Sequence, residues 1–331
     1  MSIEADAIKG KYFRVLDHGF VSLVDYMGDD AAVVQAARVS YGAGTKTPKD
    51  DRATLRYMRR QRHTSPFEQV ELKFHVKLPI FVARQLIRHR TANINEYSMR
   101  FSLPFMQFYM PKPEHMGTQS KKNKQGRAEP VSVEHGSRIL DKWAHLQRES
   151  VELYELITAK DVDLARELAR MHLPVSIYTE WYWKIDMHNL MHFLCLRCDG
   201  HAQWEIQQFS NMKASMMKLV APVSYEAWID YAFQARTFSR MEMVMLRRML
   251  YVHRAPDVAP FVTPLGGCVT KEVADGMGMT AREWDEFVET FDLKTDPTRY
   301  EKPIDFILDV ASAVPAELLQ QEALMSAPRV P

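Results

Sequence analysis

Apolar and polar residues alternate strictly between Glu68 and Leu78, so all apolar side chains fall on one face. The apolar positions are Val70, Leu72, Phe74, Val76 and Leu78. This period of two predicts a strand with one buried face. Pro79 suits the first turn of a helix, and the next residues predict a short helix from Ile80 to His89.

The same analysis predicts further strands at residues 12–16, 21–26, 105–110 and 177–185. Helices are expected at residues 31–40, 47–60, 133–158, 163–172, 186–197, 202–219 and 241–252. Asp29 and Asp30 can cap the first of these helices. Helices and strands do not alternate regularly, and no glycine fingerprint follows a strand. We therefore predict an α+β fold, with a mixed or antiparallel sheet packed with long helices and a mostly helical C-terminal extension.

Residues 1–250 are expected to form one main domain, and residues 251–331 the extension. Prolines and glycines between residues 256 and 267 mark a linker, and Thr280 with Glu283 forms a capping box for a helix to about Leu293. We expect the tail from Pro315 to be poorly ordered. Residues 112–130, rich in Lys, Gln, Gly, Ser and Pro, predict a mobile surface loop.

Charge and cysteine content limit the partners and the compartment. The 331 residues carry 43 basic and 42 acidic side chains, so no net field draws the chain to nucleic acid. No apolar run is long enough for a bilayer, and the N-terminus lacks a signal-peptide core, which predicts a cytoplasmic protein without a membrane partner. Three cysteines fit a reducing compartment, and Cys195 and Cys198 are expected to be two buried thiols.

Candidate chemistry is concentrated between Arg88 and Arg100. Arg88, His89 and Arg90 are consecutive and must point in different directions, which suits a phosphate-rich ligand that the chain surrounds. Ser98 can add a neutral donor, and Glu96 can accept from a ribose or a base N–H. A solvated basic loop at a helix end is the alternative for the basic residues alone.

These residues resemble the signature of the flavin-dependent thymidylate synthases, which fixes six positions within thirteen. Other stretches that are similar to this family lie at residues 37–40, 63–68, 83–85, 170–174 and 190–206. The resemblance runs in order from about Tyr12 to about Ala235. It implies that residues 1–250 form the catalytic domain, whereas the role of residues 251–331 stays open.

The resemblance implies reductive methylation of dUMP to dTMP. Methylenetetrahydrofolate would give the carbon, and FAD reduced by NADPH would carry the hydride. Family members are homotetramers with FAD shared across subunits, so a homotetramer is implied here too. No nucleic-acid partner and no metal are expected.

The resemblance also implies roles for individual residues. Arg197 would be catalytic, because a fixed cation against the uracil would stabilise negative charge on the ring. Substrate-binding residues would be Gln85, Arg88, Glu96, Ser98, Arg100, Arg170 and Arg197. Cofactor-binding residues would be Ser40, His63, Ser65, Arg88, His89, Arg90, Glu96, Asp186, His188 and His192.

Some of these residues have plain structural alternatives. The resemblance implies that Arg170 reaches the nucleotide from another subunit, but it could instead serve as a cation at a helix C-terminus. A lone histidine such as His63 is often structural. Glu68 and Glu205 are undecided between structural ion pairs and supports for the site.

Two other classes of protein remain as alternatives. One is a non-enzymatic nucleotide- or RNA-binding protein that stacks bases on Trp181, Tyr182 and Trp183. The other is a metal-dependent redox protein that uses His188, His192 and the cysteine pair, although no third ligand accompanies the histidines. A yellow protein without stoichiometric metal would exclude both.

Overall fold

The computed structural model describes residues 2–39, 51–121, 124–252, 271–276, 284–285 and 304–325. The chain forms two compact units, Met1–Phe233 with Asp305–Pro331, and Gln234–Ile304. Among the helices in these ranges, none combines the length and the apolar character that a membrane span requires.

The first unit is built on a six-stranded sheet in the order β4-β7-β3-β2-β1-β8, and every pair of neighbours is antiparallel. The strands are β1 (Tyr12–Val15), β2 (Gly19–Met27), β3 (Glu71–Pro79), β4 (Asn93–Glu96), β7 (Tyr178–Asp186) and β8 (Ala313–Val314). The strands predicted around residues 12–16, 21–26, 68–78 and 177–185 are confirmed. The central pair, β3 with β7, runs in register from Glu71 opposite Asp186 to Pro79 opposite Tyr178.

The helices confirm the predicted α+β class. In the first unit they are α1 (Ile3–Ile8), α2 (Asp30–Arg38), α3 (Asp51–Arg60), α4 (Ile80–Leu86), α5 (Val133–Thr158), α6 (Arg166–Ala169), α7 (Met187–Arg197), α8 (Trp204–Val220), α9 (Pro222–Trp228) and α13 (Ala316–Met325). Short 3₁₀ turns are η2 (Phe67–Gln69), η3 (Pro113–His115), η4 (Arg170–His172) and η7 (Val310–Ser312), and η5 (Ile229–Phe233) is a π-helical turn. The second unit contains α10 (Arg240–Val252) and α11 (Lys271–Gly276).

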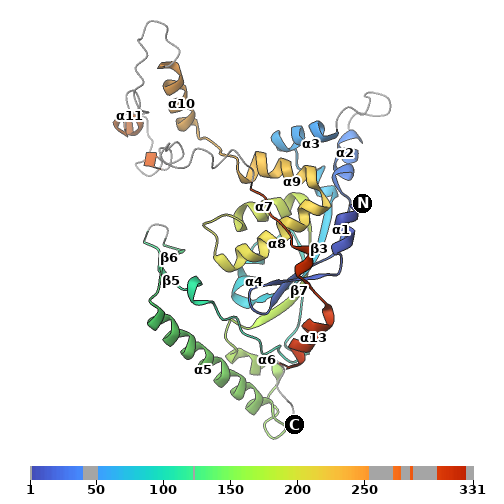
Figure 1. The fold of residues 1–331 in the computed structure, drawn as a ribbon, viewed down its shortest axis with the longest axis vertical. Coiled ribbons are helices and arrows are strands. Elements are labelled where there is room, and N and C mark those ends of the chain that lie inside the picture. The colour runs from blue at the N-terminus through green and yellow to red at the C-terminus, as the bar shows by residue number, and fades with distance from the viewer. Residues whose placement is uncertain are drawn as a thin grey trace. The chain divides into compact units, whose positions relative to one another are not determined.

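Helices α7 and α8 pack on one face of the sheet (Figure 1). The alternating apolar residues of β3 belong to the same buried cluster as Phe193 of α7 and Phe209 of α8. Trp183 of β7 is fully buried in this cluster, and its ring lies 5.1 Å from that of Phe193. Because Trp181 is also buried, only Tyr182 of the three neighbouring aromatic residues presents a surface for stacking.

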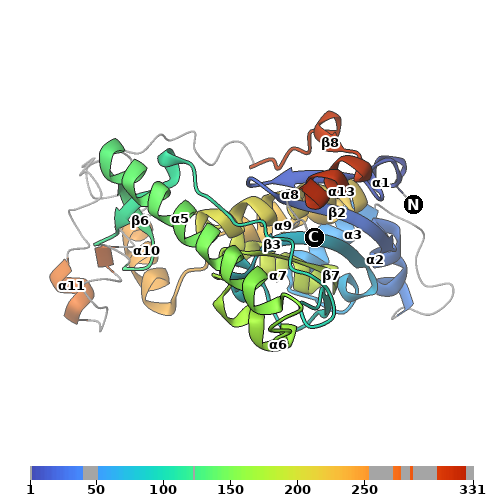
Figure 2. The same ribbon diagram turned by 90° about the horizontal axis from the view of Figure 1, so that it is seen from below.

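Helix α5 is one uninterrupted helix, with the bounds that its periodicity predicts (Figure 2). Only Gly136 and Tyr154 are buried along it, whereas Trp143 and Leu146 are exposed. Ser132 caps its N-terminus by accepting a hydrogen bond from the His135 N–H.

Three predictions were wrong, one for a strand, one for a loop and one for the tail. Residues 105–110 form no strand, because Met106 adopts a φ of +50° and only Phe108 makes an isolated bridge to Ile177. The predicted loop at 112–130 contains an antiparallel hairpin of β5 (Gly117–Gln119) and β6 (Arg127–Pro130). The tail predicted to be poorly ordered from Pro315 contains α13.

Two further strands, β4 and β8, were not predicted from the sequence. β4 lies inside the basic signature, the segment from Arg88 to Arg100, and β8 pairs with β1 at the sheet edge. Phe306 and Leu308, just before β8, pack against the main core. The helix expected after Thr280 falls almost wholly outside the described residues.

Candidate functional site

His89 and Arg197 meet where α4 and α7 end. The Arg197 Nε–H donates to His89 Nε2 at 3.0 Å, and the ring of His89 lies 4.8 Å from that of Phe193. Burial, together with the nearby Arg197 and His192, lowers the pKa of His89 to about 4. His89 is therefore neutral at pH 7, which leaves Nε2 free to accept from the guanidinium.

The rest of the Arg197 guanidinium is available to a ligand. Arg197 is half-buried, and burial lowers its pKa. Within the residues that the structure describes, its only hydrogen bond is the one to His89, so both Nη groups are open. A guanidinium fixed through Nε and partly removed from water presents a two-pronged donor to anionic oxygens.

Two basic side chains, His188 of α7 and Arg59, each have one buried nitrogen without a partner among the described residues. Among the described residues, neither His188 Nδ1 nor Arg59 Nε has a hydrogen-bond partner. Burial lowers the pKa of both groups, and the charge of Arg59 lowers that of His188 further. Because desolvated basic groups are stabilised by an anion, this donor set fits the phosphates of a dinucleotide such as FAD.

Arg59 was not predicted from the sequence. The available signal was the basic run Arg59, Arg60 and Arg62 immediately before His63. Such a run is also expected wherever a helix ends, because cations interact favourably with that end of the dipole.

Asp186 caps α7. Its Oδ1 accepts from the Asn189 N–H at 2.9 Å, and its Oδ2 accepts from Asn189 Nδ2 at 2.7 Å. Four residues apart on this helix, His188 and His192 lie near Arg59 and His89 respectively. Helix α7 thus connects the group formed by Arg59 and His188 with the group formed by His89 and Arg197.

The remaining cofactor-side residues are exposed. Arg88 and Arg90 flank His89, and both side chains face solvent. His63 lies 6.2 Å from Tyr57 between ring centroids, and Ser65 follows it on the surface. Ser40 lies outside the described residues.

A second group gathers the residues predicted to bind the nucleotide phosphate. The carboxylate of Glu167 lies 3.2 Å from Arg100 Nη2. The backbone carbonyl of Glu167 accepts a hydrogen bond from Arg170 Nε at 3.4 Å. The Ser98 hydroxyl accepts from the Arg100 N–H at 3.3 Å. The ion pair is exposed and contributes little to stability, so a phosphate can readily displace it.

Glu96 lies on β4, in the part of the sheet where that strand pairs with β7. Its Oε1 accepts from the Thr179 hydroxyl at 2.7 Å, which leaves Oε2 for a ligand. Glu96 is exposed, and its neighbour on β7 is Trp181. The strand therefore fixes the direction of a carboxylate within the signature.

A third group surrounds Gln85. Gln85 Nε2 donates to Gln203 Oε1, and Gln203 Nε2 donates to Glu205 Oε2 at 2.8 Å. Glu205 is buried and forms an ion pair with Arg127. Arg127 was missed because its segment was predicted to be a mobile loop.

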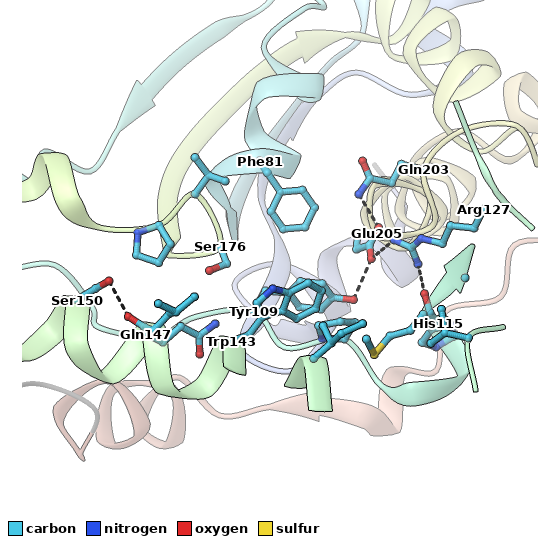
Figure 3. A pocket seen from close by; sticks show the side chains of 18 residues that line it. Phe81, Tyr109, His115, Arg127, Trp143, Gln147, Ser150, Ser176, Gln203 and Glu205 are labelled. Atoms are coloured by element: carbon cyan, nitrogen blue, oxygen red, sulfur yellow. Dashed lines mark hydrogen bonds and ion pairs between the residues drawn. The ribbon is translucent and has the colours of Figure 1, made fainter. Parts of the chain in front are cut away.

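The same carboxylate lies at the polar end of a cavity of about 500 Å³ (Figure 3). Phe81, Tyr109 and Trp143 form much of its apolar wall, and Gln203, which immediately precedes α8, also lines it. None of the site residues predicted from the sequence lines this cavity.

Cys195 and Cys198 are poor nucleophiles in this environment. Burial raises the pKa of both thiols, and Trp228 Nε1 donates to Cys195 Sγ at 3.1 Å. Cys268 lies outside the described residues. We expect replacement of all three cysteines by alanine to leave turnover per bound flavin largely intact while lowering the melting temperature.

Thermal unfolding and turnover per flavin, measured on the same preparations, check this prediction. Loss of turnover with flavin content and fold retained would show that a thiol takes part in the reaction.

Comparison with known proteins places this site in context. A profile described as "Thymidylate synthase complementing protein" matches residues 22–223, a range that contains every predicted site residue. A flavin-dependent thymidylate synthase of Ruegeria pomeroyi is 48% identical over 275 residues, which span 82% of this chain and 85% of that protein. One of Gluconobacter oxydans is 45% identical over 284 residues, spanning 85% and 87%.

The fold is also similar to that of solved UMP/dUMP methylase structures. The UMP/dUMP methylase PolB of Streptomyces cacaoi, bound with 5-Br UMP, superposes with a TM-score of 0.60 at 33% sequence identity. The match covers 67% of this chain and 98% of that one.

Proposed function

The chain belongs to the flavin-dependent thymidylate synthases, and we propose that it converts dUMP to dTMP with methylenetetrahydrofolate as carbon donor and NADPH as reductant of bound FAD. Family membership supports the overall reaction. Within the site, the observation that carries the proposal is the Arg197 guanidinium, anchored through Nε on a neutral His89 with both Nη groups open.

FAD would be held along α7. Arg59, His188 and the exposed Arg88 and Arg90 offer donors to its phosphates, and the unpartnered buried nitrogens of the first two support this assignment. His63 and Ser65 follow α3 and would contact the same cofactor. Reduced FAD supplies the hydride when bound.

The nucleotide would lie between Arg197 and the pair Arg100 and Arg170. Arg100 would exchange its ion pair with the Glu167 carboxylate for the dUMP phosphate, and Arg170, which bonds the backbone carbonyl of Glu167, and Ser98 would add further donors. Arg197 would then face the uracil and stabilise negative charge that develops on its oxygens.

This function is tested by incubating the purified, FAD-loaded protein with dUMP, methylenetetrahydrofolate and NADPH. We expect flavin absorbance and stoichiometric dTMP, detected by chromatography, with none formed when the folate is omitted. Replacing NADPH by dithionite separates reduction from methyl transfer. An FAD-loaded protein that forms no dTMP with either reductant would overturn the proposal.

FAD occupancy and assembly are expected to be coupled. The proposed cofactor contacts are widely separated in sequence, and a homotetramer with shared FAD sites would explain how they are completed. A ligand that binds only the assembled state stabilises that state by mass action. Adding FAD to stripped protein should therefore raise both the melting temperature and the tetramer fraction.

Light scattering and thermal unfolding, with and without FAD, measure the two effects. Riboflavin, which lacks the phosphates, serves as the control and should change neither quantity appreciably. A monomer that binds FAD at unchanged mass would contradict the shared site.

A further inference from the structure

A buried carboxylate lies behind the predicted substrate-binding residue Gln85. Glu205, in the first turn of α8, is 1% exposed, and Arg127 Nη2 donates to its Oε2 at 2.5 Å. The Tyr109 hydroxyl donates to Oε1 at 3.0 Å. Burial alone would raise the pKa of Glu205, but the hydrogen bonds and charge of Arg127 hold it below the ordinary value. Glu205 is therefore an ionised carboxylate that only accepts hydrogen bonds.

This charge determines the orientation of two amides. Gln203 must direct its NH₂ group to Glu205, so its Oε1 faces Gln85. Gln85 must in turn donate from Nε2. The NH₂ group and the oxygen of a side-chain amide are nearly identical in shape. Here the Glu205 carboxylate, at the end of the chain of hydrogen bonds, fixes the orientation of both amides because it can only accept.

The orientation leaves a defined edge of Gln85 unused. One Nε2–H is committed to Gln203, while Oε1 and the second N–H remain. Across the described part of the chain, no group donates to Gln85 Oε1. This oxygen suits a donor on the nucleotide, such as the uracil N3–H or a deoxyribose hydroxyl, and the second N–H suits an adjacent acceptor.

We propose that Arg127, Glu205 and Gln203 are positioning residues, which orient the amide of Gln85 toward bound dUMP. The inference rests on the proposed function, since it takes dUMP as the ligand of Gln85. It assigns the β5–β6 hairpin a role in nucleotide affinity, because that hairpin supplies the arginine at the far end of the network.

The hairpin is held firmly enough to serve this role. Arg127 Nη1 also donates to the His115 carbonyl at 2.7 Å, which ties β6 to the turn before β5 (Figure 3). The ring of His115 stacks on Trp204 of α8, with centroids 3.6 Å apart. Both contacts bring the hairpin to the helix end that carries Gln203 and Glu205.

A purely structural ion pair makes a different prediction. If Arg127 and Glu205 only fasten the hairpin, breaking their network lowers stability without changing dUMP affinity. If they orient Gln85, affinity falls and the loss depends on Gln85 being present. A double-mutant cycle separates the two cases.

The cycle uses Gln85→Met and Gln203→Met, because methionine matches the length of glutamine but lacks its amide. Dissociation constants for dUMP are measured on FAD-loaded protein by calorimetry, beside kcat and KM. We expect each single variant to bind dUMP about tenfold more weakly, since one well-placed hydrogen bond has this effect. The double variant should be no weaker than the weaker single variant.

Asp305→Asn provides a matched control. Asp305 forms an ion pair with Lys218, at 2.6 Å, and so fastens another segment to the opposite end of α8. This variant should retain wild-type dUMP affinity even if its melting temperature falls. Glu205→Gln is a second probe, which should raise KM for dUMP more than it lowers kcat.

Gln203→Met binding dUMP within twofold of wild type would overturn the inference, as would fully multiplicative losses in the double variant. In either case wild-type turnover of dUMP would leave the proposed function standing. A wild-type holoenzyme that neither binds nor converts dUMP would overturn both. Should Glu205→Gln fail to fold, the methionine cycle still decides.

Discussion

Replacing Arg197 with alanine is expected to abolish most dTMP formation while the protein keeps its fold and its FAD. The guanidinium is half-buried and anchored on His89, so its charge acts where water is partly excluded. Removing one preorganised electrostatic group typically costs about 10²–10³ in rate. Lysine should restore little, because a point charge cannot bond to His89 and two ligand oxygens as a planar fork does.

The measurement is single-turnover conversion of dUMP by pre-reduced enzyme at saturating nucleotide. Reduction of the flavin by NADPH, followed separately, controls for damage to the cofactor site. A variant within a few-fold of wild type in methyl transfer would remove Arg197 from the mechanism and leave it a cation at the end of α7.

Replacing Lys213 with methionine is expected to stabilise the protein. Lys213 is completely buried in α8, and its Nζ donates only weakly, to the Phe209 carbonyl at 3.4 Å. Among the described residues no carboxylate pairs with it, although the rings of Trp183 and Phe193 lie within 5.7 Å of Nζ. Replacing buried charged groups by well-packed apolar residues often stabilises a protein by roughly 1–4 kcal/mol, and we expect a gain in this range.

The gain should depend on pH in a defined direction. Burial lowers the pKa of Lys213 from 10.5 to about 7, against a small opposing contribution from Cys198. Between these values the unfolded chain binds a proton that the folded chain does not, so wild-type stability rises with pH from about 7 to about 10.5. The methionine variant lacks this contribution and should gain most near pH 7 and below.

Urea unfolding at pH 7 and at pH 9 tests both the sign and the slope. Lys218→Met on the same helix is the matched control, because Lys218 is partly exposed and paired with Asp305. It should give no comparable gain. A Lys213→Met protein that is less stable than wild type at pH 7 would mean that contacts of the ammonium with the aromatic rings outweigh its desolvation.

Elements with a complete local signal were predictable from the sequence. The alternation before Pro79 identified β3 and the start of α4, and the periodicity from Val133 to Thr158 matched α5 at both ends. The reason is that periodicity and caps act within a few residues of chain. The basic signature was visible for the same reason, because residues 88–100 are contiguous.

Elements held by distant partners were not predictable. β4 is polar and lacks alternation, and it is a strand because β7 offers it an edge. The N-terminus of α9 receives its cap from Asp30, whose carboxylate accepts from the Val223 and Ser224 N–H groups at 2.7 and 2.8 Å. Asp30 was read locally as a cap for α2, a role that Asp29 performs.

The sequence by itself determined the fold class, the main helices and strands, and the polar segment from Arg88 to Arg100, because each depends on neighbours along the chain. Only the tertiary structure decided which of these residues meet. Arg127 and Glu205 are 78 positions apart, and Arg197 reaches His89 across 108. Such pairs are favoured by burial, because removing a polar group from water is costly unless another group takes up its hydrogen bonds.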